Sequence, residues 1–458
     1  MSAMKAARTC LLAGLASCVA GPAYDLRVAA QPAPGPRDAG ASDRAGLSAR
    51  RGLRGALERH DGLRVLRLWG TPTERGYAHG ALLAEDIAAI MRQEFAARFA
   101  STPALLDQAR AALARLIEYP EEVEQELDGL WQGVLASEVD LDMPALGRRF
   151  DRVDLGVANA LDVFGLMGCS GFTVWGDEVV GGGVLTARNF DWPLTGAHML
   201  EHTLLIVQEL GDGRQVASLG WPGYVGTVTG VSADGVAASL HVGSARLRLP
   251  EPSSWPAAIA VRKLLASSAR GEDRLAQAQA YIEYTSPPVG FLTHVVLPEA
   301  PAQGAPAVVF EADARRCVRG GPRDDVVVVT NHFTTREDGA GASGDSLARQ
   351  AALQQALQTC VELGDRRVDV GEAWRALAAV EAGGGRFFGT LHALVFRHDP
   401  WVFEVAVAAL DEDGAVLAAP SGGRRHRLSR AQVFGRAAER RRGPWNRDPA
   451  GAVGPAPR

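Results

Sequence analysis

The stretch that decides the fold is Gly168-Cys169-Ser170-Gly171-Phe172-Thr173-Val174-Trp175, followed by Gly181-Gly182-Gly183 and then by Ala187-Arg188-Asn189-Phe190-Asp191-Trp192. β-Branched and aromatic residues flank a glycine-rich connection, a pattern that predicts two antiparallel strands joined by a turn. With the turn centred near residues 179–180, residue 169 pairs with residue 190 or 191. We therefore expect the Cys169 thiol to lie beside Asp191, with Arg188 further along the same strand. These surroundings suit a nucleophile.

The Gly-Cys junction, a strand, a turn and then Arg-Asn-x-Asp together resemble the cysteine N-terminal-nucleophile hydrolases. That group includes the penicillin acyltransferase-like C45 peptidases, the bile-salt (choloylglycine) hydrolases and the acid ceramidases. In these families the chain cuts itself before the cysteine, and the freed α-amine serves as the base. The resemblance, which covers roughly residues 62–410, implies that Cys169 is the nucleophile and that Gly168–Cys169 is the scissile bond.

Three further positions resemble the same families. Asn331 follows a predicted strand, as does the family asparagine that helps to form the oxyanion hole, although a turn asparagine is the simpler interpretation of the pattern alone. Ser346-Leu347-Ala348-Arg349 resembles the late Ser-x-x-Arg, whose arginine lies near the nucleophile; a solvated helix arginine is the alternative. His241 stands where the bile-salt enzymes carry an asparagine, so it is expected to supply or replace that oxyanion donor.

The periodicity of the remaining chain predicts a mixed α+β protein. Strands are expected at 63–68, 203–208, 215–219, 225–230, 236–240, 291–297, 307–310, 326–330, 387–395 and 401–407. Helices are expected at 81–100, 103–119, 120–137, 144–164, 256–268, 273–284 and 345–363, the last capped by Asp345 or Ser346. This order fits the four-layer αββα sandwich that the resemblance implies, preceded by a mostly helical pre-segment.

The predicted organisation has a pre-segment at 51–168, a catalytic core at 169–420 and an arginine-rich, flexible tail at 421–458. The pre-segment is too long for a discarded leader, so we expect it to remain bound as an α-subunit and to form an α/β heterodimer with the core. Within it, Gly76 and Gly80 precede a helix, and His79 is interpreted as a packed or capping histidine.

The first 18 residues have the layout of a secretory signal, with Lys5 and Arg8 ahead of a short apolar run. Leu15-Ala16-Ser17-Cys18 resembles the bacterial lipobox, which implies lipidation of Cys18; a plain signal peptide cut near Ala20 or Ala23 is the alternative. Residues 19–50 are rich in Pro, Gly and Ala and are expected to be a disordered linker. We therefore expect an exported cell-envelope lipoprotein that faces the periplasm.

Composition excludes several classes of function. The net charge of −5 gives no general attraction to nucleic acid, and no run of about 20 apolar residues predicts a membrane span. His198 and His202 have helical i, i+4 spacing, but no neighbouring glutamate or third ligand accompanies them, so we expect no metal. Ser170 lacks the glycine elbow of serine hydrolases. No cofactor motif occurs.

Three cysteines remain outside the export signal. One Cys317–Cys360 disulfide would leave Cys169 free, and two unpaired buried thiols are the equal alternative. The sequence thus predicts a self-cleaving cysteine amidohydrolase or acyltransferase that acts on a small linear amide or N-acyl substrate through a thioester. Two other classes stay open: a non-catalytic envelope lipoprotein, and a Cys–His thiol hydrolase with His332 or His241 as its base.

Overall fold

The computed structural model describes residues 52–160, 168–193, 198–245, 252–285, 287, 290–302, 304–321, 325–339, 341–363, 367–382, 388–410, 416–418 and 420–435. The export signal, Cys18 and all of the predicted linker therefore lie outside the described residues. Within the described ranges, none of the helices combines the length and the apolar character that crossing a bilayer requires.

The larger of two sheets has nine strands, and all neighbours in it are antiparallel except β2 and β7. In spatial order they are β1 (Gly55–His60), β2 (Leu63–Leu68), β7 (Leu204–Glu209), β8 (Gln215–Gly220), β9 (Thr229–Ser232), β10 (Ala237–Val242), β11 (Phe291–Val296), β12 (Ala307–Ala312) and β13 (Cys317–Gly320). The expected strands are confirmed except that β9 begins four residues late, and the sequence analysis missed β1 and β13.

The smaller sheet has six antiparallel strands and carries the predicted hairpin at its centre. Its order is β14 (Val326–Val329), β5 (Gly168–Trp175), β6 (Val184–Pro193), β15 (Phe388–Arg397), β16 (Val402–Val407) and β19 (Arg425–Arg427). The β5–β6 connection contains Gly181, Gly182 and Gly183, whose φ angles are 76°, 70° and 83°. L-residues with a side chain rarely adopt three such angles in succession, so the turn requires this glycine run.

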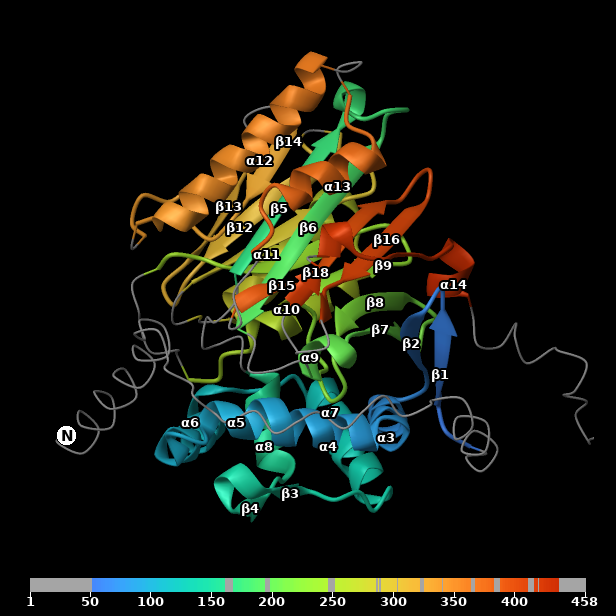
Figure 1. The fold of residues 1–458 in the computed structure, drawn as a ribbon, viewed down its shortest axis with the longest axis vertical. Coiled ribbons are helices and arrows are strands. Elements are labelled where there is room, and N and C mark those ends of the chain that lie inside the picture. Colours follow the sequence, from blue (N-terminus) through green and yellow to red (C-terminus); the bar gives the residue numbers. More distant parts are fainter. Residues whose placement is uncertain are drawn as a thin grey trace, which may run out of the picture.

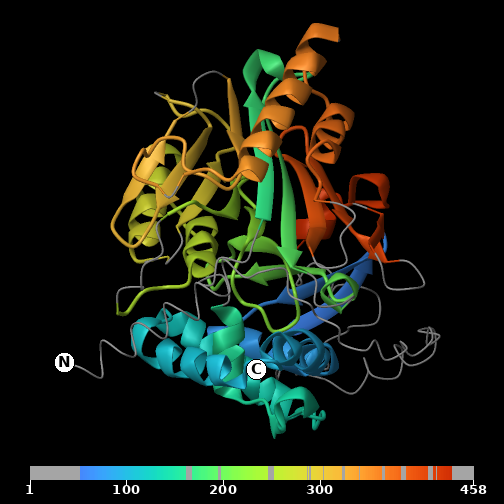
Figure 2. The ribbon, with the colours of Figure 1, turned by 60° about the vertical axis from the view of Figure 1, so that its left-hand side comes forward.

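The two sheets face each other across an apolar core, and helices cover their outer faces (Figures 1 and 2). Val65, Leu205 and Leu219 from the larger sheet pack with Leu394 and Phe396 from the smaller one. Helices α10 (Ala257–Leu265) and α11 (Gly271–Glu283) lie on the larger sheet. Helices α12 (Gly344–Leu363) and α13 (Val370–Ala378) cover the smaller one. This arrangement confirms the four-layer αββα sandwich.

The pre-segment forms a helical group below the sheets in Figure 1. It consists of α3 (Pro72–Leu82), α4 (Ala84–Ile90), a π-helical turn (Met91–Phe95), α5 (Ala96–Phe99), α6 (Pro103–Leu116), α7 (Glu121–Leu135), the short strands β3 (Asp142–Met143) and β4 (Arg148–Arg149), and α8 (Arg152–Asn159). The helix expected from residue 81 begins nine residues earlier, because Thr71 and Glu74 form a capping box.

The prediction of one helix at 144–164 is wrong over most of the described part of this range. Pro144–Leu146 form a 3-10 turn that ends at Gly147, whose φ is 63°, and β4 follows. The chain becomes helical again only after Asp151, whose side chain accepts hydrogen bonds from the Val153 and Asp154 backbone. A left-handed glycine and a new N-cap thus divide a stretch whose apolar spacing alone looked continuous.

The prediction of a flexible tail is also wrong for the part of the tail that the structure describes. Residues 420–435 form a 3-10 turn (Pro420–Gly422), β19 and α14 (Arg430–Phe434), while β17 (Ala409–Leu410) and β18 (Val416–Ala418) form a small separate ladder. Val433 is fully buried in the core between the sheets, and the Arg67 guanidinium donates to its carbonyl at 2.9 Å. The arginines suggested a solvated end, but the chain here docks on the pre-segment.

Two glycine pairs bring helices α3 and α7 into backbone contact. A Cβ at Gly76, Gly80, Gly129 or Gly133 would lie 1.9–2.2 Å from a backbone oxygen of the facing helix. Real Cβ atoms do not approach oxygen so closely, so no larger residue fits without moving the helices apart. Gly76 and Gly80, which were expected to precede a helix, lie within α3, and their spacing is a packing requirement of the fold.

We expect Gly129→Ala to lower the free energy of unfolding by about 1–3 kcal/mol, because the new methyl group forces α3 and α7 apart. Intrinsic helix propensity acts in the opposite direction and favours alanine. Urea unfolding measures the change. Gly211→Ala is the matched control, because a Cβ at Gly211 meets no atom within 4 Å. Equal stability of the two variants would contradict the close packing.

Candidate active site

Cys169 lies on β5 directly opposite Phe190 of β6, within the register that the sequence predicted. Residues paired across antiparallel strands share a face of the sheet, and Arg188 lies two residues before Phe190 on that same face. The Arg188 Nη2 donates to the Cys169 Sγ at 2.7 Å, and the thiol in turn lies 3.5 Å from the Leu240 carbonyl oxygen. The thiol is completely buried between the two sheets.

The expectation that the Cys169 thiol lies beside Asp191 needs a correction. Asp191 pairs with Gly168 and alternates with Phe190, so its side chain points to the helix-covered face. There it accepts a hydrogen bond from the Thr390 hydroxyl at 2.6 Å. Burial raises the pKa of the Asp191 carboxyl. Arg188, which was expected further along the strand, is the charged group in contact with the sulfur.

The guanidinium of Arg188 is buried, and its five N–H groups all have acceptors. Nε donates to the Asn189 carbonyl, Nη1 to the Val228 carbonyl and the Thr229 hydroxyl, and Nη2 to the Leu240 carbonyl and the Cys169 sulfur. Four acceptors are neutral oxygens, so the sulfur is the only one of the five that can become an anion. The protein thus aims one N–H of a fixed cation at the thiol.

Burial and the charge of Arg188 shift the pKa of the Cys169 thiol in opposite directions. Desolvation raises the pKa of Cys169, because an apolar surrounding disfavours the thiolate. The positive charges of Arg188 and Arg349 lower it, and the net pKa in the uncut chain is raised. The closed site therefore holds a neutral thiol that already has a cationic partner for its ionised form.

Asn331 and Arg349 hold the backbone of Cys169. The Cys169 N–H donates to the Asn331 Oδ1 at 2.9 Å, and the Arg349 Nη1 donates to the Cys169 carbonyl at 2.5 Å. Arg349 also donates to the Asn331 Oδ1 at 2.9 Å, which ties the two residues together. Asn331 follows β14 and Arg349 lies on α12, as the sequence indicated. The structure thus brings both residues to Cys169.

The expected cap of α12 is wrong, and the serine has another contact. The Ser343 hydroxyl, rather than Ser346 or Asp345, accepts a hydrogen bond from the first turn. Ser346 is fully buried, and its hydroxyl accepts from the Asn331 backbone N–H at 2.8 Å. Ser346 therefore positions the asparagine that contacts Cys169.

The two histidines considered as bases contact serines. His241 is buried with its Nε2 2.9 Å from the Ser239 hydroxyl, and the His332 Nδ1 lies 2.8 Å from the Ser346 hydroxyl. Burial, followed by the charge of Arg188, holds the pKa of His241 well below its usual range. Within the described chain, the hydrogen-bond partners of the thiol are Arg188 and Leu240, so the geometry gives no support to a Cys–His pair.

The remaining cysteine and histidine predictions have mixed outcomes. Cys317 on β13 and Cys360 on α12 are free thiols, so the disulfide alternative is wrong. Cys317 lies in the edge strand of the larger sheet, whereas Cys360 lies on a helix that covers the smaller sheet. The His202 Nδ1 lies 2.7 Å from an Asp86 carboxylate oxygen, while the His198 side chain lies outside the described residues. The described residues contain no cluster of three potential metal ligands.

A buried ionic network joins the pre-segment to the core, and the sequence analysis missed it. Glu126 of α7 is fully buried and pairs with Arg262 of α10. The Gln208 side-chain amide donates a hydrogen bond to the Glu126 carboxylate at 2.7 Å. The Arg75 guanidinium lies 3.5 Å from the same carboxylate. Periodicity gave no signal for this contact, because Glu126 lies in an otherwise acidic helix start whose glutamates look solvated.

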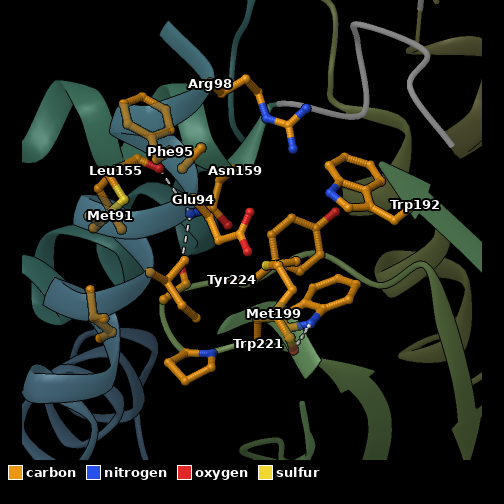
Figure 3. A pocket seen from close by; sticks show the side chains of 15 residues that line it. Met91, Glu94, Phe95, Arg98, Leu155, Asn159, Trp192, Met199, Trp221 and Tyr224 are labelled. Carbon is orange, nitrogen blue, oxygen red and sulfur yellow. Dashed lines mark hydrogen bonds between the residues drawn. The ribbon is translucent and has the colours of Figure 1, made fainter. Parts of the chain in front are cut away.

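A pocket lies between the pre-segment and the core (Figure 3). Its walls carry Met91 and Phe95 from the helices, and Trp192, Trp221 and Tyr224 from the core. Its cavity volume is about 70 Å³, and it is partly open to solvent. The sequence analysis did not identify these residues; the only available signal was the aromatic Trp-Pro-Gly-Tyr turn at 221–224.

The comparisons with known proteins agree with this geometry. The family model for acyl-coenzyme A:6-aminopenicillanic acid acyl-transferase matches residues 180–409, half of the 458 residues, and the chain belongs to that family. This assignment confirms the resemblance to penicillin acyltransferase-like proteins. The matched stretch contains every predicted site residue after Cys169, namely Arg188, Asp191, His241, Asn331 and Arg349.

An uncharacterized protein of Archaeoglobus fulgidus is 24% identical over 60% of this chain and 51% of its own length, so the chain spans about half of that relative. Among solved structures, a Caenorhabditis elegans ortholog of N-acylethanolamine-hydrolyzing acid amidase is 16% identical over 50% of this chain and 92% of that chain, with a TM-score of 0.35. A mutant conjugated bile acid hydrolase from Clostridium perfringens is 10% identical over 57% and 96%, with a TM-score of 0.36. The family assignment rests on the family model.

We expect Glu126→Gln to lower the free energy of unfolding by about 3–5 kcal/mol, because it leaves buried Arg262 and Arg75 without their carboxylate. Glu122→Gln is the matched control on the same helix. Its partner Lys263 is half-exposed, so its loss is expected to cost less than about 1 kcal/mol. Urea unfolding of both variants measures the difference, and equal losses would contradict the structural role of Glu126.

We expect His79 to make the stability depend on pH. Its Nε2 accepts from the Gly223 N–H at 2.9 Å, and burial lowers its pKa from 6.5 to about 4. The unfolded chain therefore binds a proton that the folded chain excludes between these values. About 3 kcal/mol of stability is present above pH 6.5 and is lost as the pH falls toward 4. His79→Gln should make the free energy of unfolding depend less on pH in urea titrations at pH 7, 5.5 and 4. An unchanged pH dependence would contradict this role of His79.

Proposed function

We propose that this protein is a cysteine amidohydrolase or acyltransferase that activates itself by cutting the Gly168–Cys169 bond. The observation that carries the proposal is the convergence on Cys169. Arg188 contacts its sulfur, Asn331 its amide nitrogen and Arg349 its carbonyl oxygen. These side chains come from β6, the end of β14 and α12. A purely structural cysteine needs none of these charged contacts.

In the self-cleavage step, the Cys169 sulfur attacks the Gly168 carbonyl carbon. The carbon–nitrogen bond breaks, the nitrogen gains the thiol proton, and a thioester links Gly168 to the sulfur. Water then hydrolyses the thioester, giving a Gly168 carboxyl group and a free thiol with an adjacent α-amine. The ordinary pKa of an α-amine is about 7.7–8.0 and that of a thiol about 8.5, so the amine can accept the thiol proton near neutrality.

The contacts of the uncut chain suit the later steps. The nitrogen held by Asn331 becomes the α-amine, and the sulfur held by Arg188 becomes the attacking thiolate. Asp191 would orient the amine and stabilise its ammonium form. We propose that the Asn331 amide, together with the buried neutral imidazole of His241, donates to the oxyanion. The substrate amide acylates the sulfur and releases its amine, and water or a second amine removes the acyl group.

We propose further that the two pieces stay together as an α/β heterodimer. The β2 strand of the pre-segment pairs with β7 inside the nine-stranded sheet, and Glu126 pairs with Arg262 across the junction. Separation would break sheet hydrogen bonds and leave buried charges unpaired. The sequence pattern at 1–18 supports export and lipidation at Cys18, and hence a membrane-anchored location in the cell envelope.

The test is amide hydrolysis that depends on Cys169. We expect the protein to release the amine from N-acyl amides, and Cys169→Ala to lower the rate at least about 1000-fold because the nucleophile is gone. Brief incubation followed by hydroxylamine should yield an acyl hydroxamate from the thioester. Cys317→Ala, which removes a free thiol elsewhere, is the control and should retain activity. Hydrolysis that survives in Cys169→Ala would contradict the proposal, and ligand binding without hydrolysis would favour a non-catalytic lipoprotein.

A further inference from the structure

The pocket of Figure 3 shares aromatic side chains with the buried cluster that contains Cys169. Phe190, the cross-strand neighbour of Cys169, stacks on Trp192 with ring centroids 6.0 Å apart and lies 5.5 Å from Trp221. These side chains and Cys169 belong to one buried cluster. Trp192 and Trp221 also line the pocket. An acyl group attached to the sulfur therefore has an apolar, aromatic surface leading into this space.

The core side of the pocket is built on the loop at 221–225, and the pre-segment holds that loop by its backbone. Asn159 at the end of α8 donates to the Gly223 carbonyl at 2.8 Å and accepts from the Val225 N–H at 2.8 Å. His79 of α3 accepts from the Gly223 N–H at 2.9 Å. Both side chains are fully buried, so water does not replace these bonds when they are lost.

The loop has little freedom to find another position. Gly223 has a φ of 82°, and a Cβ there would lie 3.4–3.5 Å from the Ile87 and Leu155 side chains of the pre-segment. Trp221 is fixed by an Nε1–H bond to the Met199 carbonyl at 3.1 Å. The positions of Trp221 and Tyr224 relative to the helices thus depend on the contacts that Asn159 and His79 make.

We propose that Asn159 and His79 are positioning residues through which the pre-segment determines which apolar acyl group the enzyme accepts. The pocket would take an aryl or medium-length alkyl group between the helices and the aromatic loop. This inference rests on the proposed amide chemistry at Cys169. The pre-segment would then be part of the substrate site, in addition to its structural contribution to the larger sheet.

The experiment compares the N-acetyl, N-hexanoyl and N-phenylacetyl amides of 7-amino-4-methylcoumarin. We expect Asn159→Ala to lower kcat/KM for the hexanoyl and phenylacetyl amides at least about tenfold more than for the acetyl amide, mainly through KM. A small acyl group does not reach the loop. His79→Leu is expected to have the same direction of effect, while His79→Gln, which keeps an acceptor for Gly223, should restore most of the selectivity.

Gln132→Ala is the control, because Gln132 is exposed on α7 and does not line the pocket. Met91→Ala is an independent variant, because Met91 makes none of the hydrogen bonds to the loop. It enlarges the pocket on the helix side, so it should favour the hexanoyl amide over the acetyl amide. Equal loss for all three amides, or unchanged selectivity in Asn159→Ala, would overturn the proposal while the amide chemistry stands.

A second measurement tests ligand binding in the pocket independently of amide hydrolysis. If wild type hydrolyses none of the three amides, calorimetric titration with hexanoate and phenylacetate tests the pocket directly. Weaker binding to Asn159→Ala and His79→Leu, with unchanged binding to Gln132→Ala, would support the positioning role although the proposed activity had failed. Absent or unaltered binding would overturn it.

Discussion

The site depends on one contact, the N–H of Arg188 on the sulfur of Cys169. A buried guanidinium is costly unless its donors are satisfied, and here carbonyl and hydroxyl oxygens satisfy four of the five. The fifth is directed at the sulfur, which burial keeps protonated in the uncut chain. The two-sheet arrangement supplies these acceptors, because β6 carries the arginine while β9 and β10 present oxygens across the core. The sandwich therefore builds the surroundings of the thiol on which the proposed chemistry depends.

The second constraint is that the pre-segment cannot be separated from the core without damage. It contributes β1 and β2 to the larger sheet, a buried carboxylate to Arg262, and two side chains to the loop beside the pocket. Close packing of α3 on α7 fixes the spacing of the two helices that carry His79 and Glu126. These contacts thus tie the pre-segment to the core.

Local patterns in the sequence predicted much of this, because hairpin register and strand alternation are local properties. The pairing of Cys169 with Phe190 and the places of Asn331 and Arg349 followed from such patterns and from the family resemblance. The same alternation, applied one step further, would have put Asp191 on the opposite face from the thiol. Contacts between distant segments gave no signal: Glu126 with Arg262, Asn159 with the 221–225 loop, and α14 with Arg67 depend on tertiary packing that periodicity does not encode.

The most direct test of self-activation is the intact mass of the purified protein without residues 1–18, beside its Cys169→Ala variant. Self-cleavage predicts two masses for the wild type, which correspond to a break between Gly168 and Cys169 and elute together from a sizing column under native conditions. It predicts one uncut mass for the variant. A single uncut mass in both proteins would contradict self-activation, because no α-amine would then exist to serve as the base.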